Sequence, residues 1–211
     1  MTRILWIGAA VLWCLFTYWY TNTAGPLQPE EIDAYLDALR SREDGSLRAG
    51  SDGVDEASMR RFLEADDGGQ FIMVNLLDLN DSPPTVPGAD PGESAASLLG
   101  RYMEFMYPAL FRRACHPIWA GRVAGPAVDL IGVPDGGHWE QAALMRYRSR
   151  RDLMDIASNP EFAGRHDFKM AALTKTIAVP TVNQLSFSDP RWLLASLLVT
   201  VCALLTLLRH R

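Results

Sequence analysis

Two uncharged apolar runs lie at the two ends of the chain, and every acidic residue lies between them. Residues 4–20 and 192–208 contain no charged side chain, and each run has 17 residues. A helix of that length rises about 25 Å, close to the shortest segment that crosses a bilayer core. Tryptophan and tyrosine side chains, which favour the lipid–water boundary, gather near the ends of the runs. We therefore predict transmembrane helices within 1–25 and 190–211, rather than two buried core helices.

Basic residues flank these runs on their outer sides. Arg3 precedes the first run, and Arg209 and Arg211 follow the second. Cytoplasmic flanks of membrane helices carry an excess of Lys and Arg. We therefore expect an integral protein of a bacterial inner membrane, with both termini in the cytoplasm and the middle of the chain in the periplasm. A signal peptide cleaved after residue 25 is the alternative for the first run, because small residues precede that point.

The segment that follows the first run has the spacing of two amphipathic helices. Pro29-Glu30-Glu31 opens the first, and Asp55 is placed to cap the second. Residues 26–69 are therefore expected to form a helical lead-in. Residues 70–77 (QFIMVNLL) are an almost continuous apolar run, typical of a buried strand. Residues 78–93 are rich in Pro and Gly and are expected to form a loop.

From residue 94 the pattern alternates between helical and extended periodicity. The predicted elements are a helix over 94–114, strands over 116–123, 127–133 and 139–148, an interrupted helix over 149–173 and a strand over 176–187. Pro180 lies inside the last strand, so we expect that strand to change partner midway. Residues 70–189 thus predict an α+β domain with a βαββαβ plan, a ferredoxin-like antiparallel sheet with helices on one face.

The first strand has no polar alternation, so both of its faces are expected to be apolar. Phe71 and Met73 point to one face, and Ile72 and Val74 point to the other. Helices cover only one face in this plan, and an exposed apolar sheet face needs a cover. We therefore predict a two-fold homodimer whose sheets face each other.

Composition narrows the classes of function. The chain has 20 basic and 25 acidic residues, and only two of the basic residues are lysines. The segment 21–190 keeps all the acidic residues and loses four of the basic ones, so its net charge is −9. Such an acidic domain argues against nucleic-acid binding. Three scattered cysteines suit neither a disulfide framework nor a zinc site, and no nucleotide-binding or nucleophile-elbow motif is present, so no metal or cofactor is expected.

Three polar residues on predicted strands are candidate ligand contacts. Asn75 interrupts the apolar first strand, where an amide needs a partner, either a ligand or the neighbouring strand. Arg146 and Arg148 lie on one face of the third strand, where each needs a carboxylate or an anionic ligand. An ion pair with an acid such as Glu140 or Glu104 is the alternative for both arginines.

Tyr102 and His166 are the candidates for proton transfer. Tyr102 lies on the apolar stripe of the long helix, where it is either core or a proton donor. His166 lies on the later helix, on one stripe with Phe162 and Met170. The other histidines of the middle segment, His116 and His138, start strands near turns, where solvated histidines are common. The spacing of these three histidines matches no metal motif.

Two phrases of the sequence resemble a known family. Residues 147–162 (YRSRRDLMDIASNPEF) are similar to a strand-to-helix signature that ends in S-P-E-Y. That signature belongs to a domain-of-unknown-function branch of the dimeric α/β-barrel superfamily. Residues 102–109, followed by Pro117–Gly121, resemble the Tyr-bearing helix that leads into a strand of that family. The resemblance covers residues 70–187. Phe162 stands where the family has Tyr, and Lys169 where it has Arg, so contacts through those groups differ here.

The resemblance implies a ferredoxin-like domain of the dimeric α/β-barrel type, and a range of activities. Members include haem-degrading and quinone-forming monooxygenases, isomerases and proteins without known activity, so fold alone does not assign function. In haem-degrading members, an Asn on the first strand, a Trp on the third and a His on the second helix carry the chemistry. This chain has Asn75, Trp139 and His166 in that order, although Trp139 stands at the start of its strand.

These residues support two hypotheses of function. The first is a membrane-anchored domain that binds a small apolar or aromatic carboxylate, with Asn75, Arg146 and Arg148 as ligand-binding residues. The alternative is a cofactor-independent or haem-linked monooxygenase or isomerase, with His166 or Tyr102 moving the proton. The expected partners are the lipid bilayer, a second copy of the chain and a small-molecule ligand.

Overall fold

The structure is a computed structural model that describes residues 2–41, 55–162, 164–184, 186 and 189–209. The chain divides into two compact units. One unit comprises the end segments Met1–Ala24 and Asn183–Arg211, and the other comprises Gly25–Val182. The two units are described separately below.

The unit of end segments consists of two apolar helices, α1 (Thr2–Tyr20) and α7 (Pro190–Arg209). Both are long and apolar enough to cross a membrane, and Tyr20 and Cys202 are the buried residues among them. The helices pack antiparallel, because the Trp13 indole Nε1 donates to the Arg191 carbonyl oxygen at 2.9 Å and Cys202 is buried beside Leu5. The prediction of two apolar helices that can span a membrane is therefore confirmed, whereas the side that each end faces stays a prediction.

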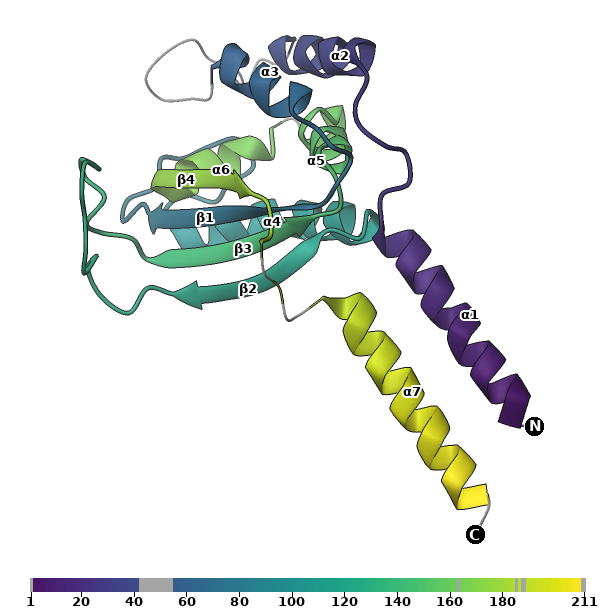
Figure 1. Cartoon of the computed structure of the whole chain (residues 1–211). Helices are drawn as coiled ribbons and strands as arrows, with labels where there is room; N and C mark the ends of the chain where they lie inside the picture. Colours follow the sequence, from purple (N-terminus) through teal and green to yellow (C-terminus); the bar gives the residue numbers. More distant parts are fainter. Residues whose placement is uncertain (1, 42–54, 163, 185, 187–188, 210–211) are drawn as a thin grey trace. The chain divides into compact units, whose positions relative to one another are not determined.

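The unit Gly25–Val182 is built on a four-stranded antiparallel sheet (Figure 1). The strands are β1 (Phe71–Leu79), β2 (His116–Arg122), β3 (Gln141–Tyr147) and β4 (Leu173–Thr181), in the order β2-β3-β1-β4. The helices of this unit are α2 (Pro29–Arg40), α3 (Glu56–Glu64), α4 (Ala95–Arg112), α5 (Arg150–Ala157) and α6 (His166–Ala172), with a 3₁₀ turn at Pro160–Phe162. The predicted α+β class is therefore confirmed.

The hydrophobic core lies between the sheet and helices α4, α5 and α6. Phe71 and Met73 of β1 pack against Leu110 of α4 and Ile156 of α5. Further along β1, Leu77 joins a second cluster with residues of α4 and α6. Because neighbouring residues of a strand point to opposite faces, the residues between these positions lie on the other face of the sheet. They are Ile72, Val74 and Leu76, which pair in register with β3 and β4.

Polar caps fix the starts of three helices where the sequence predicts them. The Asp55 carboxylate accepts from the Ser58 amide at 2.8 Å, and the Ser94 hydroxyl accepts from the Ser97 amide at 3.3 Å. The Ser149 hydroxyl accepts from the Asp152 amide at 3.1 Å at the start of α5. Each cap satisfies an amide that has no partner within its helix.

The lead-in helices α2 and α3 pack onto α5. Their contact is a cluster of buried side chains formed by Leu27, Ile32, Leu36, Leu39, Leu63 and Met154. Around it, the Tyr35 hydroxyl donates to the Asp155 carboxylate at 2.5 Å, and Arg151 forms an ion pair with Glu31. Apolar burial and polar contacts therefore join α2 to the same helix.

The prediction of a strand over 127–133 is wrong. Those residues belong to the connection between β2 and β3, residues 123–140, which has no strand (Figure 1). Val128 and Ile131 are almost fully exposed in it. Gly132 has a φ of +69°, a conformation that breaks an extended strand, and prolines at 126 and 134 lack amide donors. An apolar segment therefore does not form a strand unless a neighbouring strand can pair with it.

The last strand also differs from the prediction. It begins at Leu173, three residues before the predicted start, and ends at Thr181. It pairs with β1 along its whole length, so the expected change of partner midway is wrong for the described residues. Pro180 lies opposite Met73 in this edge strand, where a proline can lack its N–H without breaking the sheet interior. Part of the predicted strand, at residues 185 and 187, lies outside the described residues.

Candidate binding site at one end of the sheet

The amide of Asn75 is held by the strands around it. Its Nδ2 donates to the Met73 carbonyl oxygen at 3.0 Å and to the Ala143 carbonyl oxygen at 3.4 Å. Asn75 lies between Met73 and Leu77 on the helix-covered face of β1. Its donors therefore bond to the backbone, as in the structural alternative that the sequence leaves open.

Arg146 is buried at the end of the sheet where β1 begins, which we call the closed end. Its Nε donates to the Gln70 side-chain oxygen at 2.8 Å, and its Nη1 donates to the Ala114 carbonyl oxygen. Ala114 has a φ of +54° just after α4, a conformation that reverses the chain at the helix end. Protein groups therefore hold this guanidinium on two of its sides.

Arg148 lies one residue beyond β3 at the same closed end and forms a two-bond ion pair with Asp152. Its Nε and Nη2 donate to the two carboxylate oxygens at 2.9 and 2.7 Å. The Asp152 carboxylate raises the pKa of Arg148 above its ordinary value. The acid partner comes from α5, and it is neither Glu140 nor Glu104, the two acids suggested by sequence.

Cys115 lies beneath this closed end and is chemically quiet. It is fully buried, and the Arg148 amide donates to its Sγ at 3.3 Å. Burial raises the pKa of its thiol to about 11. Because the thiolate is the reactive form, this cysteine is not a nucleophile at neutral pH.

Tyr102 and His166 lie on the helices rather than in a cavity. Tyr102 packs against both core clusters, which agrees with the core interpretation of its apolar stripe. The Lys169 amine lies 5.9 Å from the centroid of the Tyr102 ring, and burial lowers the pKa of this amine. His166 is the half-buried first residue of α6. None of the described cavities includes Tyr102, His166 or Lys169 in its lining.

The opposite end of the sheet, where β1 ends, is hollowed, and we call it the open end. A cavity of about 490 Å³ lies there, between the ends of β1 and β2 and the start of β3. It is lined by Leu79, Arg122, Val123, Ala124, Gly125, Pro126, His138, Trp139, Glu140 and Gln141. Apolar groups and one indole therefore form walls beside an arginine, a histidine and a glutamate.

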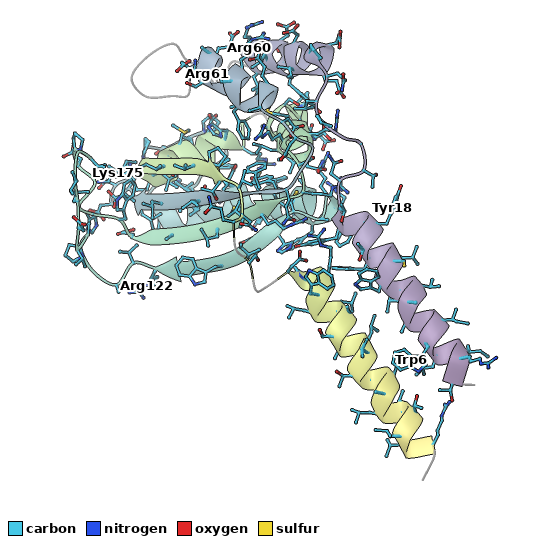
Figure 2. All side chains as sticks on the ribbon, in the orientation of Figure 1. Trp6, Tyr18, Arg60, Arg61, Arg122 and Lys175 are labelled. Carbon is cyan, nitrogen blue, oxygen red and sulfur yellow. The ribbon has the colours of Figure 1, made fainter. Side chains whose placement is uncertain are left out.

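A cluster of three titratable side chains lies at this open end. The Asp78 carboxylate, at the end of β1, lies 3.5 Å from His138 Nε2 and 3.8 Å from Lys175 Nζ. Asp78 is buried, whereas the imidazole is 71% exposed and lines the cavity. Figure 2 shows Lys175 and Arg122 at this same end of the sheet. Residues from β1, β4 and the β2–β3 connection therefore meet here.

Lys175 links the cluster to the β2–β3 connection. Its ammonium donates to the Asp135 carbonyl oxygen and lies 4.8 Å from the centroid of the Trp139 ring. The Trp139 indole donates to the Gly136 carbonyl oxygen at 2.8 Å. These contacts hold Trp139 at the cavity wall although the connection has no secondary structure.

Arg122 is available to a ligand. Its side chain is exposed at the cavity, and within the described part of the chain no carboxylate or carbonyl group pairs with its guanidinium. This contrasts with Arg146 and Arg148, which protein groups hold. An unpaired guanidinium beside an apolar cavity is a ready partner for a carboxylate.

The sequence indicates this site only weakly. His138 lies near a turn, where solvated histidines are common, and Trp139 starts its predicted strand. Asp78 falls in the loop predicted over 78–93, whereas the structure places it in β1. The one available signal is an acid directly after an apolar run, because connections at strand ends often carry binding and catalytic residues. Among the described residues, no group of three or more His, Cys, Asp or Glu side chains is arranged to hold a metal ion.

Comparison with known proteins gives a fold neighbour. No protein-family model and no curated protein matches the chain. The chain is similar to the crystal structure of RPA0582, a protein of unknown function from Rhodopseudomonas palustris, with 19% identity and a TM-score of 0.52. That match covers 65% of this chain and 99% of the other, and the methylated form of RPA0582 gives a TM-score of 0.53 at 19% identity, over 67% and 100%. At this identity the likeness concerns the fold alone.

Proposed function

We propose that this chain is a membrane-anchored domain of ferredoxin-like type that binds a small apolar or aromatic carboxylate. The strand order β2-β3-β1-β4, with helices following β1 and β3, supports the ferredoxin-like assignment. The two apolar end helices support the anchor. We also propose that the domain belongs to the dimeric α/β-barrel superfamily, because residues 102–109 and 147–162 resemble segments of that family.

One observation carries the ligand class, and it is the composition of the open-end cavity. A guanidinium and an imidazole stand at a wall that also carries an indole ring and aliphatic side chains. Arg122 offers donors to a carboxylate, and Trp139 offers a flat apolar surface to the body of the ligand. The anchor proposed here for the carboxylate is therefore Arg122, because Arg146 and Arg148 already bond to protein groups.

The test is a calorimetric titration in which phenylacetate is added to the full chain in phospholipid nanodiscs. We expect saturable binding, weakened about tenfold by Arg122→Gln, which corresponds to about 1.4 kcal/mol. Arg148→Gln, at the closed end, is the matched control for charge, and should leave the affinity unchanged in samples that remain folded. Equal affinity in the parent and Arg122→Gln, or no saturable binding, contradicts the proposed site.

We also propose that a second copy covers the sheet face opposite the helices. That face carries Ile72, Val74 and Leu76 in the middle, with Val179 and Trp119 about half exposed on the outer strands. An apolar face of this kind is a typical interaction surface. Native mass spectrometry of the full chain should show a dimer, and Val179→Glu should yield monomers. A monomeric parent chain contradicts this part of the proposal.

For the membrane, we propose cytoplasmic termini and a periplasmic domain, on the flanking arginines alone. Reporter domains fused after Arg211 and inserted at residue 90 test it. The first should report from the cytoplasm and the second from the periplasm. A cytoplasmic signal from the insertion at residue 90 contradicts the charge argument.

A further inference from the structure

The carboxylate and imidazole beside the open-end cavity have the arrangement of a proton-transfer pair. Building on the binding function proposed above, we propose that His138 is a catalytic base that moves a proton on the bound acid, with Asp78 as its positioning residue. The class of reaction is the isomerisation of a carbon acid, such as an enolisable 2-oxo acid with an apolar body.

The contact between Asp78 and His138 decides which ring nitrogen is the base. Asp78 Oδ1 lies 3.5 Å from Nε2 of the imidazole. A carboxylate beside Nε2 favours the proton on that nitrogen, which leaves Nδ1 with a lone pair. The imidazole is exposed at the cavity, so this second nitrogen can reach a ligand there.

Lys175 keeps the positioning carboxylate in place. Its Nζ lies 3.8 Å from Asp78 Oδ2, on the opposite oxygen from His138. The same amine bonds to the Asp135 carbonyl oxygen and packs against the Trp139 ring. A buried carboxylate without a cation beside it costs free energy, so Lys175 stabilises Asp78 at this position.

The proposed step conserves atoms and electrons. Nδ1 of His138 takes a proton from the carbon next to the carbonyl group, and the electron pair of the broken C–H bond forms the C=C bond of an enolate. The carbonyl oxygen takes the negative charge. The imidazolium then returns the proton to that oxygen, which gives the enol, or to the carbon. No oxidant, reductant or water is consumed.

Arg122 supplies the positive charge that this step needs. Its guanidinium lines the same cavity and makes no ion pair among the described residues. Binding the ligand carboxylate there holds the acidic C–H bond near the imidazole, and the positive charge favours the enolate.

Several charged groups lie around His138 in the fold. They are Asp78 of β1, Lys175 of β4, Arg122 of β2 and Glu140 at the start of β3. The base is the neutral imidazole, because proton transfer needs the free lone pair on Nδ1.

The test follows deuterium exchange into phenylpyruvate by proton NMR, with the full chain in nanodiscs in D₂O. Calorimetry on the same samples reports binding of phenylpyruvate separately. We expect the methylene signal to decay faster than in a protein-free sample. His138→Gln should reduce the excess rate at saturation at least a hundredfold. His116→Gln is the matched control, because His116 starts β2 outside the cavity, and it should keep the full rate.

Variants of Asp78 separate positioning from folding. Asp78→Asn should lower the saturated exchange rate while leaving the affinity for phenylpyruvate nearly unchanged, and Asp78→Glu should restore part of the rate. Saturable binding with no protein-dependent exchange overturns the catalytic inference alone. Absence of binding overturns the proposed function itself. Full exchange in His138→Gln assigns the activity to another group and also overturns the inference.

Discussion

The two ends of the sheet use the same kinds of side chain in opposite ways. At the closed end, Arg146 and Arg148 bond to a backbone carbonyl, an amide and a carboxylate, and Arg146 is buried. At the open end, Arg122 and His138 line a cavity of about 490 Å³. The closed end is sealed by α5, which is separated from β3 by two residues, whereas the open end is bordered by a connection without helix or strand.

This difference shows that the role of an arginine on a strand depends on which hydrogen-bond acceptors its neighbours supply. Near α5, the capping residue Ser149 and its partner Asp152 place a buried carboxylate within reach of Arg148. Near the β2–β3 connection, no comparable acid reaches Arg122 among the described residues. Removing the partner of a buried, paired charge is destabilising, whereas an unpaired charge at a cavity is available for binding.

The largest expected effect is at the closed end. Asp152→Ala leaves Arg148 without its ion pair and Ser149 without a partner for its hydroxyl, and should lower the free energy of unfolding by about 3 kcal/mol. Urea titration of the full chain in detergent, followed by tryptophan fluorescence, measures it. Asp78→Ala at the open end is the counterpart, with a much smaller expected loss. A loss below 1 kcal/mol for Asp152→Ala would erase the contrast between the two ends.

The second effect concerns Arg146. Arg146→Met keeps most of the aliphatic stem but leaves the Ala114 carbonyl and the Gln70 amide without their donor, which should cost about 2 kcal/mol. Phenylacetate affinity should not change, because Arg146 lies at the far end of the sheet from the cavity. Urea titration measures the free energy of unfolding, and calorimetry measures the affinity for phenylacetate. Weakened phenylacetate binding in a fully folded Arg146→Met sample would show that the ligand binds at the closed end.

The third effect, at the open end, is on ligand affinity rather than on stability. Arg122→Gln should change the free energy of unfolding by less than about 0.5 kcal/mol, because an exposed, unpaired guanidinium contributes little to stability. Its cost should appear instead in the affinity for phenylacetate, at about tenfold. The same two measurements apply. A destabilisation comparable to that of Arg146→Met would show that Arg122 has a structural partner.

The smallest effect concerns the lead-in that packs on α5. Hydrogen bonding to Arg151 lowers the pKa of Glu31 below its ordinary value of 4.5, so this pair stabilises the fold above that pH. The stability is lost as the pH falls below 4.5 through the lowered pKa of the folded state. Glu31→Gln should therefore be less stable than the parent at pH 6, by less than about 1 kcal/mol because the pair is partly exposed. Urea titrations at pH 6 and pH 3 should show a smaller difference at the lower pH, and a difference that does not shrink contradicts the assignment.

Much of the fold follows from local signals in the sequence. The cap at Asp55, the starts of the helices near 94 and 149, the apolar strand near 70 and the interruption of the helix over 149–173 all lie where their patterns predict. Those signals act within a few residues along the chain, which is why they can be seen without the structure. The two uncharged runs are equally local, because length and composition are sufficient to identify them.

The tertiary structure decided what local patterns do not contain. Residues 127–133 have strand-like composition but no neighbouring strand, and the edge position of β4 lets Pro180 stay paired with β1. The partners of Arg146 and Arg148 come from residues distant along the chain or from a helix start, and the open-end cluster joins Asp78, His138 and Lys175 across about a hundred residues of sequence. Sequence determines which side chains can carry charge. Packing alone determines which of those charges are neutralised inside the protein and which face a cavity, because pairing depends on distances that only the assembled sheet sets.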